Sequence, residues 1–259
     1  MESITVFSAG SFRYALQELS DIFRQIHHIE IKAFCGPAGI LRQQIEQGNR
    51  CDIFISANPE NVLQLADSKK IYQKLTIAFN QLALTTLNLE HFRHKSIFEL
   101  LFDRSLRLAT STPSCDPCGD YTWLLFDKIE QCFPGEGEAL KRRALKLVGG
   151  NSSNIVPKGK IASHYLLLNS YADMMLGYAH YQLRSEVKPN RYDASININS
   201  SIGLNNQAFL THMFPIEFEV KAEYVMALLN NVESAVKFFE FLCSNKAKDI
   251  IKNHGFLLE

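Results

Sequence analysis

The chain has 259 residues, 46% hydrophobic and 21% charged, which is the composition of an ordinary globular protein with room for two lobes of roughly 120 residues. Lysine and arginine together (27) equal aspartate and glutamate (27), so the formal net charge is zero, which argues against a nucleic-acid partner. The apolar runs are far shorter than the roughly 20 residues of a membrane-spanning helix, which argues against a membrane-spanning chain.

The first hundred residues alternate short apolar runs with amphipathic helical patterns, which is typical of βαβ units and a mainly parallel sheet. The predicted strands are 4–7, 29–34 and 51–57, and the predicted helices are 12–26, 40–45 and 59–66. Because the third strand is apolar almost throughout, we expect a buried sheet.

An extended stretch at 77–84 is long enough to cross between two lobes, and we place the first crossing there. A strand at 106–110, helices at 121–132 and 138–147 and a buried strand at 174–178 are predicted to form the second lobe. The polar segment 195–209 regains strand character at 208–211, and we place the return crossing there. The predicted lobes are residues 1–81 with 205–259, and residues 82–204.

The end of the chain predicts two helices that pack on the first lobe. Apolar residues recur at helical spacing over 232–243, and a second helix follows at 247–252. Gly255 stands where a helix-ending C′ glycine is expected.

Four turns share one design, in which an extended run ends, small residues follow and a helix begins. They lie at 8–12, 36–40, 116–121 and 157–161. A helix N-terminus has unpaired N–H groups and a partial positive charge, so it can bind an anion without a cationic side chain. Many such turns only start a helix, and Ser11 and Asp116 are also suitable N-cap residues.

Several runs of sequence resemble the molybdate-binding proteins of ABC importers. ITVFSAGSFRYAL at 4–16 is similar to the opening of that family, where a serine of the turn binds the oxyanion, and Ser11 matches this serine. GPAGILRQQIEQG at 36–48 and CDIFISAN at 51–58 resemble the second binding turn and the strand after it. TSTPSCDPCGDY at 110–121 is similar to a divergent branch, and Tyr178 aligns with the ligand-binding tyrosine.

The resemblance implies an α/β, two-lobed type II periplasmic-binding fold, with a mainly parallel sheet and flanking helices in each lobe. It implies a substrate-binding protein of an ABC transporter, not an enzyme, that holds molybdate, tungstate or a related tetrahedral oxyanion in the interlobe cleft. The expected partner is a membrane permease, and we expect a monomer with no cofactor and no metal site of its own.

The resemblance also assigns the ligand-binding residues. Ser11 and Tyr178 would donate through their hydroxyl groups, and the turns would donate through backbone N–H groups. The complete implied set is Gly10, Ser11, Ala38, Gly39, Cys118, Gly119, Lys160 and Tyr178.

Three residues depart from the better-known members of the family. Ala38 stands where those members carry a serine, so one hydroxyl donor is missing, at a cost of roughly 1.5 to 3 kcal/mol for a charged ligand. Lys160 could replace that donor with a cation, or lie in solvent. Asp120, if it faced the ligand, would repel a dianion and favour a zwitterionic, protonated or metal-chelate ligand, so another small anion or a chelate is the alternative ligand.

A second alternative is a thiol-dependent enzyme. Cys115 and Cys118 form a CxxC pattern at a helix start, where the pKa of a thiol is lowered. The sequence contains no zinc-ligand spacing, HExxH motif, nucleophile elbow or phosphate-binding loop, and it leaves open whether any of the six cysteines pair. His180 deserves notice because it follows Tyr178 by two residues, on the same face of the predicted strand.

The N-terminal residues enter a strand pattern without the basic and apolar segments of a signal peptide. We expect a periplasmic protein whose signal peptide has been removed, with a cytoplasmic protein as the alternative.

Overall fold

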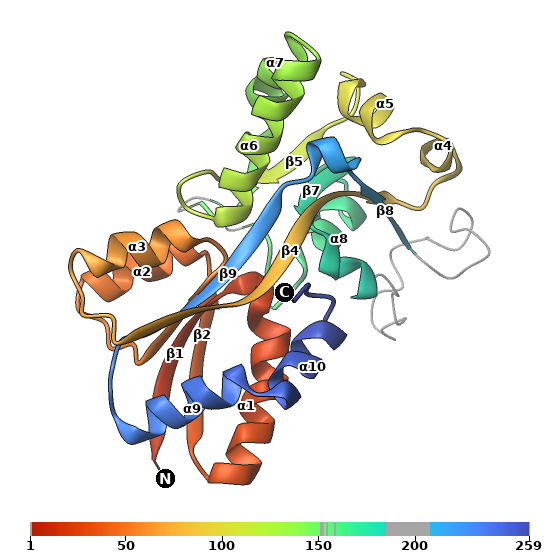
Figure 1. Ribbon diagram of the computed structural model, residues 1–259. Helices are drawn as coiled ribbons and strands as arrows, with labels where there is room; N and C mark the ends of the chain where they lie inside the picture. Colours follow the sequence, from red (N-terminus) through yellow and green to blue (C-terminus); the bar gives the residue numbers. More distant parts are fainter. Residues whose placement is uncertain (1, 151–152, 154, 158, 185–207, 259) are drawn as a thin grey trace. The chain divides into compact units, whose positions relative to one another are not determined.

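The computed structural model describes residues 2–150, 153, 155–157, 159–184 and 208–258 (Figure 1). These residues group into two compact units. Unit 1 contains residues 1–80, 113–117 and 221–259, and unit 2 contains residues 81–112 and 118–220. Both units combine a sheet with helices, which confirms the predicted α/β class.

The sheet of unit 1 has the strand order β2 (Glu30–Gly36), β1 (Ser3–Ala9), β3 (Ile53–Ser56), β9 (Lys221–Leu228) and the first part of β4 (Gln73–Leu87). β1 is parallel to β2 and β3, whereas β9 is antiparallel to β3. Every residue of β3 is buried, as its continuous apolar sequence predicts.

The helices of unit 1 pack in two groups (Figure 1). One group contains α1 (Arg13–His27), α9 (Glu233–Cys243) and α10 (Asn245–Asn253), and the other contains α2 (Ala38–Glu46) and α3 (Pro59–Ala66). α1 buries the side chains that recur at helical spacing in the sequence. These are Ala15, Leu16, Leu19 and Phe23.

Local sequence sets the ends of these helices. The Asn58 side chain accepts a hydrogen bond from the Asn61 N–H, and Pro59 occupies the first turn of α3. Gly255 has a φ of 84° directly after the C-cap of α10, which confirms the predicted C′ glycine.

The sheet of unit 2 has the order β4 (its second part), β7 (Met174–Tyr178), β5 (Leu108–Ser111) and β6 (Leu145–Val148), and β8 (Phe209–Met213) also pairs with β4. β5 is parallel to β6 and β7, whereas β4 is antiparallel to β7 and β8. Each unit therefore contains parallel strand pairs, as predicted, and also antiparallel pairs next to them.

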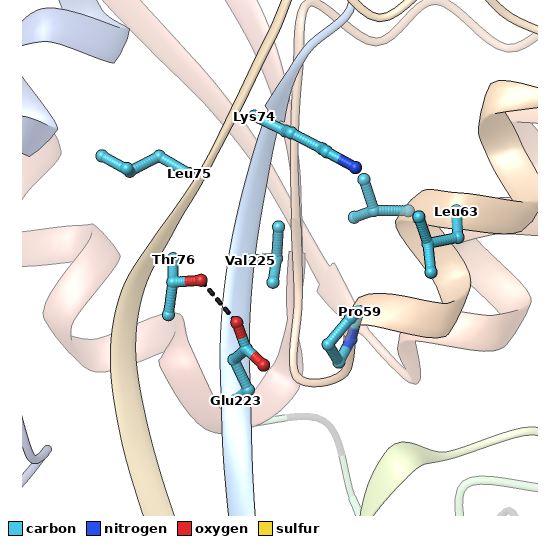
Figure 2. Close-up of a pocket in the computed structure, with 8 residues that line it drawn as sticks. Pro59, Leu63, Lys74, Leu75, Thr76, Glu223 and Val225 are labelled. Atoms are coloured by element: carbon cyan, nitrogen blue, oxygen red, sulfur yellow. Dashed lines mark hydrogen bonds between the residues drawn. The ribbon is translucent and has the colours of Figure 1, made fainter.

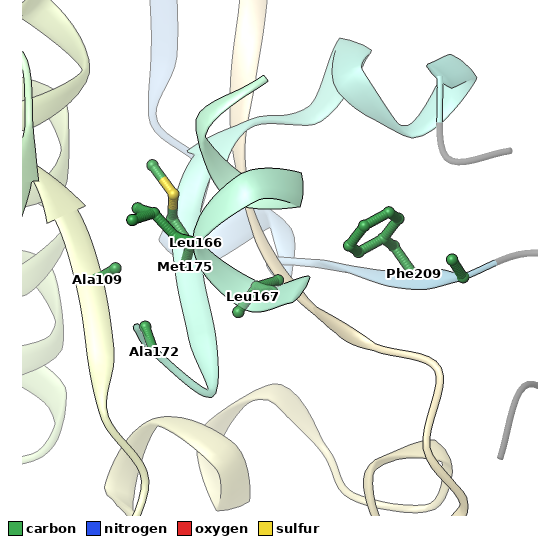
Figure 3. Packing of buried hydrophobic residues seen from close by; sticks show 7 residues of the cluster. Ala109, Leu166, Leu167, Ala172, Met175 and Phe209 are labelled. Atoms are coloured by element: carbon green, nitrogen blue, oxygen red, sulfur yellow. The ribbon is translucent and has the colours of Figure 1, made fainter. Parts of the chain in front are cut away.

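Five helices and two 3-10 helices accompany the described strands of unit 2. They are α4 (Glu90–Arg93), α5 (Ile97–Phe102), α6 (Pro117–Cys132), α7 (Glu136–Arg143), α8 (Ala162–Leu168), η2 (Ala179–Arg184) and η3 (Ile216–Phe218). Part of the core forms where α8 packs on β5, β7 and β8 (Figure 3). Leu166 and Leu167 of α8 belong to this cluster together with Ala109, Met175 and Phe209 of the strands.

The boundaries between the units differ from the predicted lobes. The first division falls between Asn80 and Gln81, one residue before the prediction, and the predicted return at 204–205 lies outside the described residues. The described residues 208–220, expected in the first lobe, group with unit 2. The physical reason is that β8 pairs with the second part of β4 and Phe209 joins the core beside α8.

Several elements also differ from the sequence-based prediction, and helices α4 and α5 were not predicted. The helix predicted at 138–147 ends at Arg143, and Leu145 begins strand β6, which pairs in parallel with β5. Strand β9 was not predicted at all. Among the described residues, no helix has both the length and the apolar character needed to cross a lipid bilayer.

Candidate functional site

The first two predicted turns lie side by side in unit 1. β1 and β2 are parallel with Ala9 opposite Gly36, so both strands end at the same level. A Cβ on Gly10 would lie 3.7 Å from the carbonyl oxygen of Gly36, which is ordinary van der Waals contact. The turns at 8–12 and 36–40 therefore present their backbones next to each other.

The segment 113–117, where the third predicted turn begins, packs against the start of α2. A Cβ on Gly39 would lie 2.8 Å from the carbonyl oxygen of Cys115 and 3.0 Å from that of Ser114. A side chain at position 39 would have to displace this backbone, so the close approach requires a glycine. Unit 1 thus joins the first two turns and the beginning of the third.

We predict that Gly39→Ala destabilises the protein by about 1 to 3 kcal/mol, because the added methyl group overlaps the two carbonyl groups. Chemical unfolding measures this change. Gly177→Ala is the matched control, since a Cβ there meets no atom within 4 Å, and it should change stability by less than about 0.5 kcal/mol. Equal effects of the two substitutions would contradict the close packing of segment 113–117 on α2.

The start of α2 is suited to an anion. Its N-cap residue, Pro37, makes no side-chain capping bond, and Ala38 is fully buried and offers no hydroxyl group. In the neighbouring helix α3, by contrast, the Asn58 side chain already caps the first turn. An uncapped first turn presents N–H groups and the positive end of the helix dipole. α9 also begins without a side-chain cap, so a missing cap alone does not identify an anion site. The start of α2 is the candidate because the turn at 8–12 lies beside it.

Ser11 lies on the 3-10 helix η1 (Gly10–Phe12), directly after β1, and is half-buried. Its Oγ is 2.7 Å from the phenolic oxygen of Tyr224 on β9. Tyr224 was not among the predicted site residues because β9 was not predicted. The alternation of charged Lys221 and Glu223 with Ala222 and Tyr224 was the available signal for that strand.

Cys118 and Gly119 lie in unit 2, in the first turn of α6. This helix begins at Pro117, before the predicted start at Tyr121 and directly after Asp116, the suitable N-cap residue, and both residues are buried. The Thr122 hydroxyl donates to the Cys118 carbonyl oxygen at 2.7 Å within the helix. Asp120, the carboxylate that would disfavour a dianion, is half-buried in the same first turn.

Tyr178 is the last residue of β7 and is 6% exposed, opposite Leu82 of β4. His180 was expected on the same face of the strand, and this expectation is wrong. β7 ends at Tyr178, so His180 lies in the 3-10 helix η2, with its ring centroid 6.2 Å from that of Tyr178.

Lys160 is exposed and lies in a turn that precedes α8. Its backbone N–H, predicted as an anion donor, donates to the carbonyl oxygen of Pro157 at 3.1 Å. The predicted backbone donor is therefore already used within its own turn, which Gly159 shapes with a φ of 86°.

The burial of Cys118 does not favour the thiol enzyme considered for the CxxC pattern. All six are present as thiols, with none joined in a disulfide. Burial raises the pKa of the Cys51 thiol to about 12 and also raises the pKa of Cys243. Cys118 is 4% exposed, whereas a reactive cysteine sits where solvent and substrate reach it.

Unit 1 also contains an open groove of about 410 Å³ between α3, β4 and β9 (Figure 2). Its lining is largely apolar, but it includes Lys74 and Glu223, whose carboxylate accepts a hydrogen bond from the Thr76 hydroxyl at 2.5 Å. Because the predicted ligand-binding residues are not among the described residues that line this groove, we place the candidate anion site at the turns.

Comparison with known proteins gives matches along the whole chain. The family model described as "Bacterial extracellular solute-binding protein" matches residues 4–257. The uncharacterized protein PM1146 of Pasteurella multocida is 32% identical over 255 residues, which cover 97% of both chains.

Two solved structures share the fold. The periplasmic molybdate-binding protein of Azotobacter vinelandii aligns over 99% of both chains, with a TM-score of 0.73 and 17% identity. The sulfate-binding protein SubI from Mycobacterium tuberculosis aligns over 99% of this chain and 86% of its own, with a TM-score of 0.76 and 12% identity. This likeness confirms the predicted fold of periplasmic binding proteins.

Proposed function

Because this chain belongs to the family of bacterial extracellular solute-binding proteins, we propose that it serves an ABC importer and captures a small tetrahedral oxyanion. Membership in this family confirms the resemblance to importer binding proteins predicted from the sequence. The observation that carries the oxyanion proposal is the meeting, within unit 1, of the turn that holds Ser11, the uncapped start of α2 and segment 113–117.

The turn that holds Ser11 and the uncapped start of α2 suit an anion for electrostatic reasons, whereas segment 113–117 places the carbonyl oxygens of Ser114 and Cys115 against Gly39. The first turn of a helix places N–H groups and partial positive charge toward a ligand, worth about 0.3 to 1 kcal/mol per helix and more when water is excluded. A hydroxyl group such as that of Ser11 adds a donor worth roughly 1.5 to 3 kcal/mol to a charged acceptor. The small residues Gly10 and Ala38 would allow the ligand to approach the backbone, whereas Gly39 is required by its contact with segment 113–117.

Unit 2 is proposed to supply the remaining donors. Cys118 and Gly119 would contribute the first turn of α6, and Tyr178 would contribute its hydroxyl group. The ammonium group of Lys160 is proposed to replace the hydroxyl that is missing at Ala38. Since one similar structure is named for molybdate and another for sulfate, we propose molybdate or tungstate from the sequence resemblance and treat the choice of oxyanion as the point to test.

Asp120 favours a second candidate ligand. A half-buried carboxylate in the first turn of α6 would attract a cationic group of the ligand and repel a bare dianion. A zwitterion or a metal chelate of similar size is therefore the alternative ligand for the same binding function.

The proposed cellular role is based on that of the family. We propose that the loaded protein works outside the cytoplasmic membrane, as a monomer, and delivers its ligand to a membrane permease. Ligand binding would bias a hinge motion between open and closed forms.

Thermal unfolding in the presence of molybdate, tungstate, sulfate, phosphate or chromate tests the proposal. A ligand at about 100 times its dissociation constant should add about 2.7 kcal/mol to the free energy of unfolding. Ser11→Ala should weaken binding by roughly ten- to a hundredfold and so reduce this gain.

Ser20→Ala is the matched control, because the Ser20 hydroxyl donates to the Leu16 carbonyl within α1, away from the turns. It should leave the stabilisation by oxyanion unchanged. Stabilisation by a chelate but by none of the oxyanions would favour the alternative ligand. If no oxyanion stabilises the protein, the oxyanion proposal is wrong while the family assignment remains.

A further inference from the structure

We propose that the groove between α3, β4 and β9 is a second ligand site, which takes a short apolar peptide of dipeptide size with free termini. The peptide carboxylate would pair with Lys74 and the peptide ammonium group with Glu223. The inference goes beyond the proposed oxyanion capture, because it assigns a different ligand to a different part of unit 1.

The groove lies within unit 1 and has the size of a small-ligand site. Its volume of about 410 Å³ falls within the roughly 300 to 1,000 Å³ that is common for such sites. Leu63 of α3 is 53% exposed at its edge, and Val62 and Val225 contribute buried apolar side chains. A ligand with an apolar body would remove this surface from water, which favours binding.

Two opposite charges distinguish the groove from a purely apolar surface. The Lys74 side chain extends toward Leu63, and the Glu223 side chain lies beside Thr76 (Figure 2). The Thr76 hydroxyl donates to the Glu223 carboxylate at 2.5 Å and so fixes the position of that carboxylate. A carboxylate has about four acceptor positions, so Glu223 can receive a ligand ammonium group while Thr76 holds it. Charge complementarity therefore favours a ligand that carries both charges.

The spacing of the charges favours a dipeptide over a single amino acid. Lys74 and Thr76 are two residues apart on β4, and alternate residues of a strand share a face. Two residues of extended chain span roughly 7 Å, which is also the distance between the termini of an extended dipeptide. In a single amino acid both charged groups are attached to the same carbon atom, so they are too close together to reach both ends of such a site.

Strand β9 separates the groove from the turn that holds Ser11. Successive residues of a strand point to opposite faces, so Glu223 and Tyr224 face opposite sides of the sheet. Glu223 lines the groove beside α3, whereas the ring of Tyr224 packs against Phe12 and Phe256. Peptide binding in the groove is therefore expected to be independent of the turns.

Calorimetric titration of the whole chain with leucyl-leucine tests the proposal. We expect saturable binding of one peptide per chain, and Lys74→Gln and Glu223→Gln should each raise the dissociation constant about tenfold. Lys32→Gln is the matched control, because Lys32 is an exposed lysine on β2, at the opposite end of the strand order of unit 1 from β4. It should leave the dissociation constant unchanged.

Blocking one charge of the peptide identifies the residue that binds it. Leucyl-leucine amide lacks the carboxylate, so Lys74→Gln should no longer affect its binding. N-acetyl-leucyl-leucine lacks the ammonium group, so Glu223→Gln should no longer affect its binding. A variant that merely failed to fold would lose all three ligands, so this pattern separates a binding role from a structural one.

No saturable binding of leucyl-leucine, or an equal effect of Lys74→Gln on the peptide and on its amide, would overturn the groove as a peptide site. Leucine that binds as tightly as leucyl-leucine would overturn the size assigned to the ligand. Ser11→Ala should leave peptide binding unchanged, and a loss of binding in this variant would move the peptide from the groove to the turns. Oxyanion binding by Lys74→Gln and Glu223→Gln should equal that of the unaltered protein, so each proposal can fail without the other.

Discussion

As the pH falls from 6.5 to 4, the free energy of unfolding is expected to decrease by about 3 kcal/mol because of His164 alone. Burial lowers the pKa of this histidine from its ordinary 6.5 to about 4. In the unfolded chain His164 takes up a proton near pH 6.5, whereas in the folded chain it stays neutral until about pH 4. The unfolded state therefore binds more protons in this window, and stability falls with the pH.

The surroundings of His164 explain the shift. It lies on α8, and its ring stacks on Phe209 of β8 with centroids 4.0 Å apart and planes at 10°. Burial also lowers the pKa of His212, whose Nε2 lies 3.2 Å from the Thr86 hydroxyl, so this histidine contributes with the same sign. Both histidines belong to the region where β8 joins unit 2.

His164→Phe should separate this effect from the titration of the other groups. Phenylalanine keeps the stack on Phe209 and carries no proton, so the loss of stability between pH 6.5 and pH 4 should shrink by about 3 kcal/mol relative to the unaltered protein. Urea unfolding at a series of pH values measures the difference. The same pH dependence in both proteins would contradict a half-buried His164 that stays neutral down to about pH 4.

Asp52→Ala is expected to destabilise unit 1 by about 3 kcal/mol, because Asp52 is a fully buried carboxylate that joins three segments. Its Oδ2 accepts from the Thr5 backbone N–H at 2.7 Å, and its Oδ1 accepts from the Asn230 side-chain amide at 2.8 Å. Alanine would leave both donors without this acceptor in a buried place. Chemical unfolding of the whole chain checks the prediction.

Arg50→Ala is the matched control for Asp52. The Arg50 guanidinium lies 3.5 Å from the same carboxylate, but its side chain is 67% exposed, so the ion pair is screened by water. This substitution should change stability by less than about 1 kcal/mol. If Asp52→Ala were as mild as Arg50→Ala, the hydrogen bonds to Thr5 and Asn230 would not be what holds β1 beside β3.

Much of unit 1 could be predicted because its sequence is locally consistent. The apolar run before Ala57 gives a buried strand, Asn58 and Pro59 give the start of α3, and Gly255 gives the end of α10. Each of these signals acts within a few residues, so neighbouring sequence is enough to read it.

Features that depend on distant contacts were missed or misplaced. Lys146 and Leu147 fit a helical pattern, yet they form β6 because the edge of β5 offers them backbone partners. Strand β9 and its Tyr224 were not predicted because their partners lie far away in sequence. β9 pairs with β3, and Tyr224 forms a hydrogen bond with Ser11. The order of the turns was visible in the sequence, but the contact of Gly39 with Ser114 and Cys115 was not.

The most direct test of oxyanion capture is calorimetric titration of the whole chain with molybdate at fixed ionic strength. The proposed function predicts saturable binding with one anion per chain, weakened roughly ten- to a hundredfold by Ser11→Ala. Absence of saturable binding by molybdate, tungstate, sulfate, phosphate and chromate alike, or binding that Ser11→Ala leaves unchanged, would contradict an oxyanion site at these turns.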